Sequence, residues 1–218
     1  MIKVINLSKK FGSHLSLDSV NIEFNLNDSV ALMGANGAGK TTLIRSILGY
    51  YHPNSGGVRV NGLDPIKERT EVLKHVSFVP QLPPPIKLSV SELISYVCKS
   101  SGVDERRIYH YANEMKFDIR SNLGKSFFKL SGGMKQKLLI AISLAKESEI
   151  VIYDEPTANL DPKAREDFYR LIQESKKEKL ALFVTHRIEE VQNIVNRQVY
   201  MDLGKIVSDE KIVSDEKL

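Results

Sequence analysis

The sequence predicts an α/β fold organised around a parallel β-sheet that is buried on both faces. Three short and continuously apolar runs predict its central strands, at residues 30–33, 150–153 and 180–184. Strands that helices cover on both faces show such runs, whereas half-exposed strands alternate between apolar and polar residues. With 218 residues, the chain is long enough for one domain with a full core and an inserted lobe.

The first third of the chain predicts an additional, antiparallel β lobe. Residues 1–7 alternate like a strand, and residues 58–60 read as a short strand between the turn sequences Gly56-Gly57 and Asn61-Gly62. Residues 42–48 carry apolar side chains at helical spacing and stop at Gly49, so one clear helix is expected there.

A phosphate-binding loop is predicted between the first apolar run and this helix. Its glycines let the backbone turn and approach phosphate oxygens, where a Cβ atom would clash. Backbone N–H groups, the positive helix end and the Lys40 ammonium then attract the anion, and the Thr41 hydroxyl is placed for a magnesium ion. A plain glycine-rich turn is the alternative, but the strand and helix context favours a nucleotide triphosphate site. The loop comprises Gly34, Ala35, Asn36, Gly37, Ala38, Gly39, Lys40 and Thr41, followed by Thr42.

Two carboxylates, Asp154 and Glu155, follow the second apolar run. Adjacent carboxylates are costly to bury without a cation or hydrogen bonds. Because side chains alternate along a strand, the two cannot point in one direction. We therefore expect Asp154 to hold magnesium and Glu155 to polarise the water that attacks the γ-phosphate.

Further motifs occur in a fixed order along the chain. Gln81 ends a strand-like run at residues 76–80, the sequence Leu-Ser-Gly-Gly-Met at 130–134 precedes a helical run, and His186 follows the third apolar run. Considered alone, Gln81 reads as a polar residue at a strand end, His186 as a helix-cap or surface histidine, and Phe11 as a packing aromatic. Their order in the chain favours a functional interpretation.

Together, these motifs resemble those of ABC ATPases, over residues 3–205. The resemblance implies a P-loop NTPase (RecA-like) core with an antiparallel β lobe and an inserted α-helical lobe. It also implies that Phe11 stacks on adenine and that Gln81 touches magnesium and the attacking water. His186 becomes the switch histidine, and Asp161 the residue at a dimer seam.

The same resemblance makes Ser131, Gly132 and Gly133 the signature that closes on the γ-phosphate of ATP bound to a second protomer. The commonest signature continues with Gln where this chain has Met134. That variant also occurs in active family members. Since the contacts to phosphate come from residues 131–133, the departure concerns fine tuning rather than phosphate binding.

The expected organisation follows the motifs. The nucleotide-binding core with its β lobe comprises residues 1–81 and 148–205, the helical lobe residues 82–147, and a short repeat tail residues 206–218. The proline-rich stretch 82–87 is a hinge-like connector. Helices are predicted from a capping box at residues 89–92, over 104–115 and after Asp161-Pro162, and residues 176–179 are expected to be a solvated helix end.

Two segments leave alternatives open. Ile86 and Leu88 either belong to a groove that docks the cytoplasmic helix of a permease or pack within the helical lobe. In the tail, the hexapeptide at residues 206–211 occurs again at 212–217. One copy is expected to pair as an edge strand and the other to hang free.

The predicted function is that of an ATP-hydrolysing motor subunit, which uses ATP and Mg²⁺, forms a head-to-tail homodimer and drives a separate membrane permease. The alternative is an ATPase that regulates a membrane complex without solute transport. A chromosome or repair ATPase would need a long coiled-coil insert, and a translation factor would normally carry two such cassettes. The motifs also look like those of export-type systems and of the subunit that serves copper-site maturation of nitrous oxide reductase.

Composition is consistent with a cytoplasmic chain held at the inner face of the membrane by its permease. No run approaches 18 apolar residues, and the start lacks the long apolar segment of a signal peptide. The single cysteine, Cys98, excludes an internal disulfide and is expected to be a reduced thiol in a helix. The net charge of +4 is mild and without a concentrated basic stripe, so no nucleic-acid partner is expected.

Overall fold

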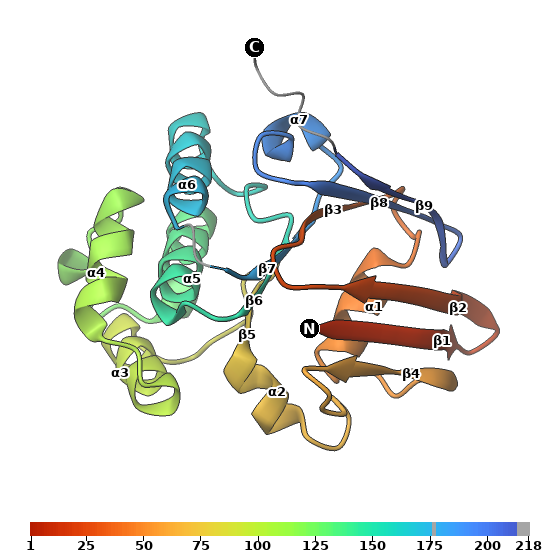
Figure 1. Ribbon diagram of the computed structural model, residues 1–218. Coiled ribbons are helices and arrows are strands. Elements are labelled where there is room, and N and C mark those ends of the chain that lie inside the picture. Colours follow the sequence, from red (N-terminus) through yellow and green to blue (C-terminus); the bar gives the residue numbers. More distant parts are fainter. Residues whose placement is uncertain (176–177, 213–218) are drawn as a thin grey trace, which may run out of the picture. The chain divides into compact units, whose positions relative to one another are not determined.

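The computed structural model describes residues 1–175 and 178–212 of the chain, which divides into two compact units (Figure 1). The first unit contains residues 1–76, 149–152 and 178–218, and the second contains residues 77–148 and 153–177. Each is described by itself. The end of the carboxylate-ending strand, residues 153–154, and the segment after it therefore group with the helical unit by their contacts.

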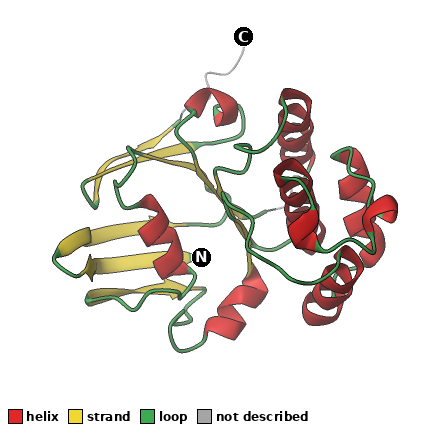
Figure 2. Ribbon diagram, turned by 180° about the vertical axis from the view of Figure 1, so that it is seen from behind, coloured by secondary structure: helices red, strands yellow, loops and turns green. Residues whose placement is uncertain are grey.

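The first unit contains an antiparallel sheet with the order β2-β1-β4. Its strands are β1 (Ile2–Phe11), β2 (His14–Phe24) and β4 (Ser55–Val60), and Ile2 pairs with both Phe24 and Val60. Alternate residues of β1, such as Ile2 and Val4, are buried. This alternation is what a sheet with one covered face requires, and it confirms the expected β lobe (Figure 2).

A six-stranded sheet has the order β5-β6-β7-β3-β8-β9. Its members are β5 (Val76–Val79), β6 (Ile150–Asp154), β7 (Leu180–Val184), β3 (Ser29–Met33), β8 (Arg197–Asp202) and β9 (Lys205–Lys211). The boundary between the two units falls within β5 and β6. In the first unit, β3 runs parallel to β7 and to β8, and β9 closes the edge antiparallel to β8. The three predicted apolar runs are thus the buried strands β3, β6 and β7.

Three helices belong to the first unit: α1 (Lys40–Ile47), α2 (Arg69–His75) and α7 (Ile188–Val191). The apolar side chains of α1 that gave the predicted helical spacing, Leu43, Ile44 and Ile47, are buried. The sequence did not predict α2. Only Val72 of α2 is buried, so this short helix has almost no apolar periodicity to reveal it.

The second unit is predominantly helical. It contains α3 (Val90–Ser101), α4 (Glu105–Glu114), α5 (Gly132–Lys146) and α6 (Pro162–Glu174), with short 3₁₀ turns at Arg120–Asn122 and Phe127–Lys129. The predicted capping box at the start of α3 is present: the Ser89 side chain accepts from the Glu92 N–H, and the Glu92 carboxylate accepts from the Ser89 N–H. Side chains of α3, α4 and α5 share one buried apolar cluster, including Ile94, Ile108 and Leu138.

Only part of the repeated tail lies within the described residues. The first hexapeptide copy forms most of β9, whereas residues 213–217 of the second copy lie outside the described residues. Residues 176–177 of the expected solvated helix end also lie outside them, and α6 ends at Glu174.

Cys98 lies half-buried in α3, and burial, together with the charges of Glu105 and Asp104, raises the pKa of its thiol. Within the described residues, no helix is long and apolar enough to cross a membrane.

Candidate functional site

The loop between β3 and α1 has the backbone shape that a phosphate requires. Gly34 and Gly39 have φ angles of 141° and 107°, which other residues rarely adopt. A Cβ atom on Gly39 would also lie 2.7 Å from the carbonyl oxygen of Ser16, and one on Gly34 would collide with the carbonyl oxygen of Met201. The backbone is therefore held close to its neighbours in a form that only glycine permits.

The loop ends at a helix terminus that the protein itself leaves uncapped. Gly39 is the N-cap residue of α1, and no side chain accepts a hydrogen bond there. The first backbone N–H groups of a helix have no partner within the helix, and the helix dipole adds positive potential. Lys40 adds an ammonium that donates to the carbonyl oxygens of Gly34 and Ala35, at 2.6 and 3.0 Å. This combination suits a phosphate group.

Neighbouring strands brace the loop. The hydroxyl groups of Thr42 and Ser16 share a hydrogen bond at 2.8 Å, and the N–H of Gly204 donates to the carbonyl oxygen of Ala38 at 3.0 Å. Thr41 is exposed, so its hydroxyl is accessible from solvent. Ser16 and Gly204 lie far from the loop in sequence, and no motif indicated their contribution.

Phe11 forms part of an aromatic and cationic cluster at the end of β1. Its ring contacts the ring of Tyr51 edge-on, with centroids 5.0 Å apart. The Lys9 ammonium lies 5.1 Å from the Phe11 ring centroid, and Arg45 donates to the Tyr51 hydroxyl at 2.8 Å. Phe11 remains 42% exposed. The ring is thus held in place but open to solvent, which suits stacking on a planar ligand.

His186 emerges from the same sheet edge as the phosphate-binding loop. Leu32 of β3 pairs with Val184 of the parallel strand β7, so both strands end at one edge. Gly34 follows β3 directly, and His186 lies two residues after Val184. The buried Thr185 lies between Val184 and His186, and its hydroxyl accepts a hydrogen bond from the Arg187 N–H at 3.0 Å. The fold of the first unit therefore brings the loop and His186 to one edge of the sheet.

In the second unit, the two carboxylates differ in environment. Asp154 is 8% exposed at the end of β6, whereas Glu155 is half-buried and has a φ of 46°. A left-handed backbone is uncommon outside glycine and occurs preferentially at functional sites. The bend ends the strand at Asp154 and turns the next side chain out of the strand register. The two carboxylates thus have the separate orientations that two roles require.

The segment after Glu155 is bound to the residues around Gln81. The Asn159 side-chain amide donates to the Gln81 carbonyl oxygen at 3.2 Å, and the buried Gln136 of α5 donates to the carbonyl oxygen of Pro156 at 3.0 Å. Gln81 itself is exposed. Asn159 and Gln136 were missed in the sequence, because nothing local indicates which distant carbonyl groups they bind.

The signature residues lie at the start of α5 on an exposed surface of this unit. Ser131 caps the helix by accepting from the Met134 N–H at 3.2 Å, and Ser131 and Gly132 are exposed. Asp161 caps α6 by accepting from the Ala164 N–H at 2.9 Å, and its carboxylate lies 3.5 Å from the Lys137 ammonium. The Ala164 N–H, together with the nearby Lys137 charge, holds the pKa of Asp161 below its usual range.

Each unit thus assembles its own share of the expected site. The first unit contains the phosphate-binding loop and His186 at one edge of its sheet and Phe11 at the end of β1, while the second contains Gln81, Asp154, Glu155, the signature and Asp161. A glycine-rich loop that opens a helix after a parallel strand defines the class as a P-loop nucleotide-binding protein.

Comparison with known proteins gives the family. Residues 17–158 match the family model described as ABC transporter. The chain is 31% identical to the phosphate import ATP-binding protein PstB of Thermotoga maritima, over 95% of this chain and 88% of that protein. It is 35% identical to the ABC transporter ced-7 of Caenorhabditis elegans, of which it spans 11% of the length.

A solved structure extends this likeness to the whole cassette. The dimeric post-hydrolysis state of the ATP-binding cassette MJ0796 bound to ADP and Pi has a TM-score of 0.84 and 25% identity, over 98% of this chain and 100% of that one. The chain therefore belongs to the ABC transporter family. It is an ATP-binding subunit of that family, with ATP hydrolysis as its activity, and the expected ABC ATPase fold is confirmed.

Proposed function

We propose that this chain is the motor subunit of a transporter, working as a homodimer with a separate membrane permease that holds it at the inner face of the membrane. The observation that most directly supports its ATP site is the uncapped start of α1, where the Lys40 ammonium donates to a carbonyl oxygen of the preceding loop. In this proposal Lys40 neutralises the β and γ phosphates, and Phe11 stacks on adenine.

Magnesium fits the oxygen donors available. Mg²⁺ prefers carboxylate, hydroxyl and phosphate oxygens and usually keeps several waters. The Thr41 hydroxyl, the Gln81 side chain and the Asp154 carboxylate offer such donors, with one carboxylate among them. When bound, the ion supplies charge neutralisation to the phosphates. Glu155 then accepts a proton from the attacking water, and His186 donates a hydrogen bond to the γ-phosphate.

The homodimer follows from where the signature lies. Ser131, Gly132 and Gly133 form a helix start in the second unit, where Ser131 and Gly132 are exposed and Gly133 is half-buried, with Asp161 as the cap of α6. An exposed helix start attracts anions, so it suits the γ-phosphate of ATP held by the partner. In this proposal residues 1–81 and 148–205 form the core, and residues 82–147 form the lobe that presents the signature.

The Glu155→Gln variant tests the proposal. It should retain ATP binding but lose hydrolysis about 100-fold or more, because the general base is gone while the magnesium donors remain. ATP should then accumulate a dimer, visible by size exclusion with and without ATP. A variant that stays monomeric in saturating ATP and still hydrolyses it well would refute the assignment.

Mixed protomers test whether the sites are shared. Lys40→Ala and Ser131→Ala subunits are combined, and the ATPase activity of the mixture is measured. If each site uses the loop of one protomer and the signature of the other, a mixed dimer has one intact site of two. Random pairing makes about half the dimers in an equal mixture mixed, so the mixture keeps about a quarter of the wild-type activity. If each site lies within one chain, no activity returns.

A further inference from the structure

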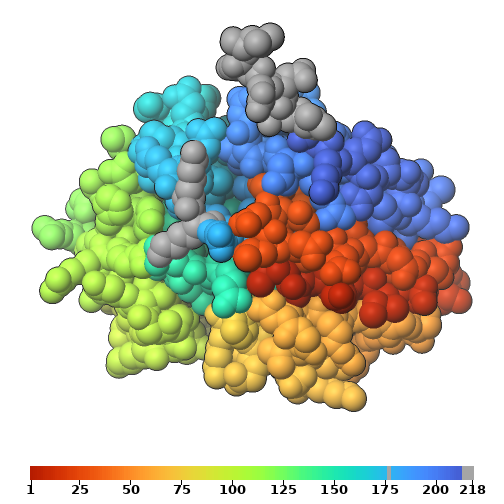
Figure 3. Space-filling view, viewed as in Figure 1, coloured from red at the N-terminus to blue at the C-terminus, as the bar shows by residue number. Residues whose placement is uncertain are grey.

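The first unit contains a cavity of about 560 Å³ that is not part of the expected nucleotide site. It is lined by residues of β1 and β4, by Ser46 of α1 and by residues 51–53 and 64–67. Figure 3 draws this part of the chain in red to orange. Sites for small molecules in proteins typically occupy about 300–1,000 Å³ and combine apolar walls with a few polar groups. The volume is therefore sufficient for a small organic ligand.

Apolar side chains make up about half of the cavity lining. They include the side chains of Leu7, Val58, Pro65 and Ile66 and the ring of Tyr51. Val58 and Pro65 are buried, whereas Tyr51 and Ile66 are half-buried. Apolar walls of this kind stabilise a bound apolar group by about 25 cal/mol for each Å² that it removes from water.

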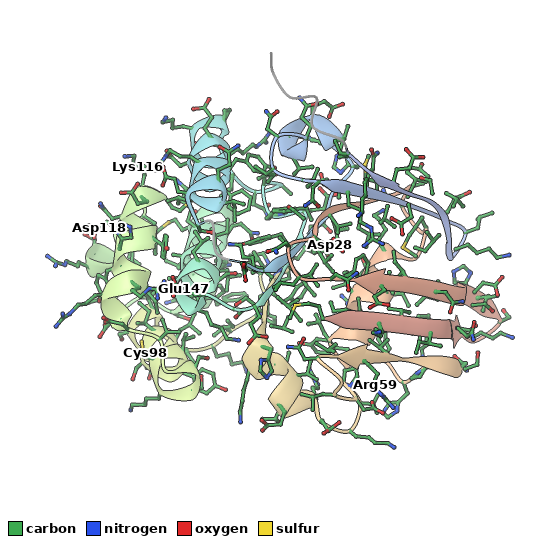
Figure 4. All side chains as sticks on the ribbon, viewed as in Figure 1. Asp28, Arg59, Cys98, Lys116, Asp118 and Glu147 are labelled. Carbon is green, nitrogen blue, oxygen red and sulfur yellow. The ribbon has the colours of Figure 1, made fainter. Side chains whose placement is uncertain are left out.

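Charges at the cavity are unequal. Asp64 is the carboxylate among the lining residues, and it is paired with Arg59 at 2.9 Å, a residue labelled beside β4 in Figure 4. The Asp64 carboxylate also accepts from the Ile66 N–H at 3.0 Å. The Glu68 carboxylate, outside the lining, accepts from the Asp64 N–H at 2.9 Å, and the exposed Lys67 forms no ion pair within the described part of the chain. The Arg59 charge therefore compensates the Asp64 carboxylate. Among the lining residues, the Lys67 ammonium leaves one excess positive charge.

The β4 wall has no side chain at one position. A Cβ atom on Gly57 would meet nothing within 4 Å, and the residue has no unusual φ, so Gly57 leaves open space that a larger residue would fill. Gly56 beside it is different, since it has a φ of 68° and its Cβ would collide with the carbonyl oxygens of Ile5 and Asn6. Gly57 is thus the position at which the cavity can be filled without backbone strain.

We propose that this cavity is a binding site for a small amphipathic anion, with its apolar body between Tyr51, Ile66 and the open position at Gly57 and its carboxylate facing Lys67. The apolar walls account for affinity, and the uncompensated ammonium selects an anion over a neutral molecule of the same shape. Phosphate alone is not a ligand, because it lacks the apolar body that the walls require.

The probes are naphthalene-1-carboxylate and its neutral counterpart naphthalene-1-carboxamide, titrated into the ¹⁵N-labelled full chain with ADP present to occupy the nucleotide site. Amide shifts should be concentrated at Gly56, Gly57 and Lys67. At low ionic strength the carboxylate should bind about three- to fivefold more tightly, as expected for an exposed ion pair. Equal affinities, or shifts concentrated on Lys40 and Thr41, would overturn the proposal.

Two variants with matched controls complete the test. Lys67→Gln should remove the preference for the carboxylate, whereas Lys74→Gln, an exposed lysine outside the lining, should leave it unchanged. Gly57→Leu should abolish binding of both probes, whereas Gly124→Leu, at another unstrained glycine with open space, should not. Folding of each variant is verified from its amide spectrum. Retained binding in folded Gly57→Leu, or a retained preference in Lys67→Gln, refutes the site.

Discussion

Gln136 donates its side-chain amide to the carbonyl oxygen of Pro156, with the two atoms 3.0 Å apart. The same nitrogen lies 3.4 Å from the carbonyl oxygen of Pro80, and the side chain is fully buried. Pro156 follows Glu155, Pro80 precedes Gln81, and Gln136 lies one turn into the signature helix. A single buried amide thus joins three of the motifs of the second unit.

Gln136→Met should destabilise the protein by about 1–3 kcal/mol, because it leaves the buried carbonyl oxygen of Pro156 without this donor, and the half-buried one of Pro80 as well, while nearly preserving volume. Hydrolysis should fall more than ATP affinity, since Glu155 and Gln81 lose a common support. Guanidinium unfolding and ATPase assays measure both. Gln173→Met, on the exposed side of α6, is the control. Wild-type stability in the Gln136 variant would show that the bond contributes little.

Lys40→Ala should weaken ATP binding about 10- to 100-fold, the range for losing a hydrogen bond from a charged group. Its melting temperature should change little, because the lost contacts are to loop carbonyl groups near solvent. Titration with a fluorescent nucleotide measures the affinity. Lys74→Ala is the matched surface change. Unchanged affinity in a normally folded Lys40 variant would remove the phosphate-binding loop from the proposed function.

Gly39→Ala should be far more damaging than Gly37→Ala. Both positions have positive φ, which costs a non-glycine residue about 1–2 kcal/mol. Only at Gly39 would the new Cβ also meet a carbonyl oxygen, whereas nothing lies within 4 Å at Gly37. Melting temperature and nucleotide titration compare the two variants. Equal losses of stability and nucleotide affinity in both variants would mean that dihedral strain alone sets the cost of replacing these glycines.

Two residues of the connector before α3 allow packing and permease docking to be tested separately. Ile86 packs against the apolar cluster of the helical unit, while Leu88 is 38% exposed. Ile86→Ser should therefore lower the melting temperature. Leu88→Ser should leave stability and ATP affinity nearly unchanged but weaken copurification with the permease, if this segment docks it. Full copurification of the Leu88 variant would place the docking surface elsewhere.

Local patterns were sufficient for the three central strands and for the phosphate-binding loop. The runs that became β3, β6 and β7 are buried along their length, so their composition carries the signal. The capping box at Ser89 and the glycines of the loop are likewise determined by neighbours in sequence. The cap of α6 at Asp161 followed from the proline after it.

Contacts between distant residues could not be predicted in this way. The Tyr51 ring contacts the ring of Phe11, forty positions earlier in the sequence. Gln136 of α5 donates to the carbonyl oxygens of Pro156 and Pro80, which lie in loops. Such pairs depend on how elements pack, which periodicity does not encode. The left-handed backbone at Glu155 was also missed, since glutamate is not a residue that indicates positive φ.

The carbonyl oxygen of Ser16 restricts how the gene can evolve. It lies 2.7 Å from the position of a Cβ atom at Gly39 and 2.8 Å from one at Gly204. A missense mutation at either codon would place a Cβ atom against this main-chain oxygen. No replacement of Ser16 can compensate, because every amino acid presents the same carbonyl group. Both positions are therefore fixed as glycine, and neutral drift in this loop is confined to exposed side chains such as Asn36.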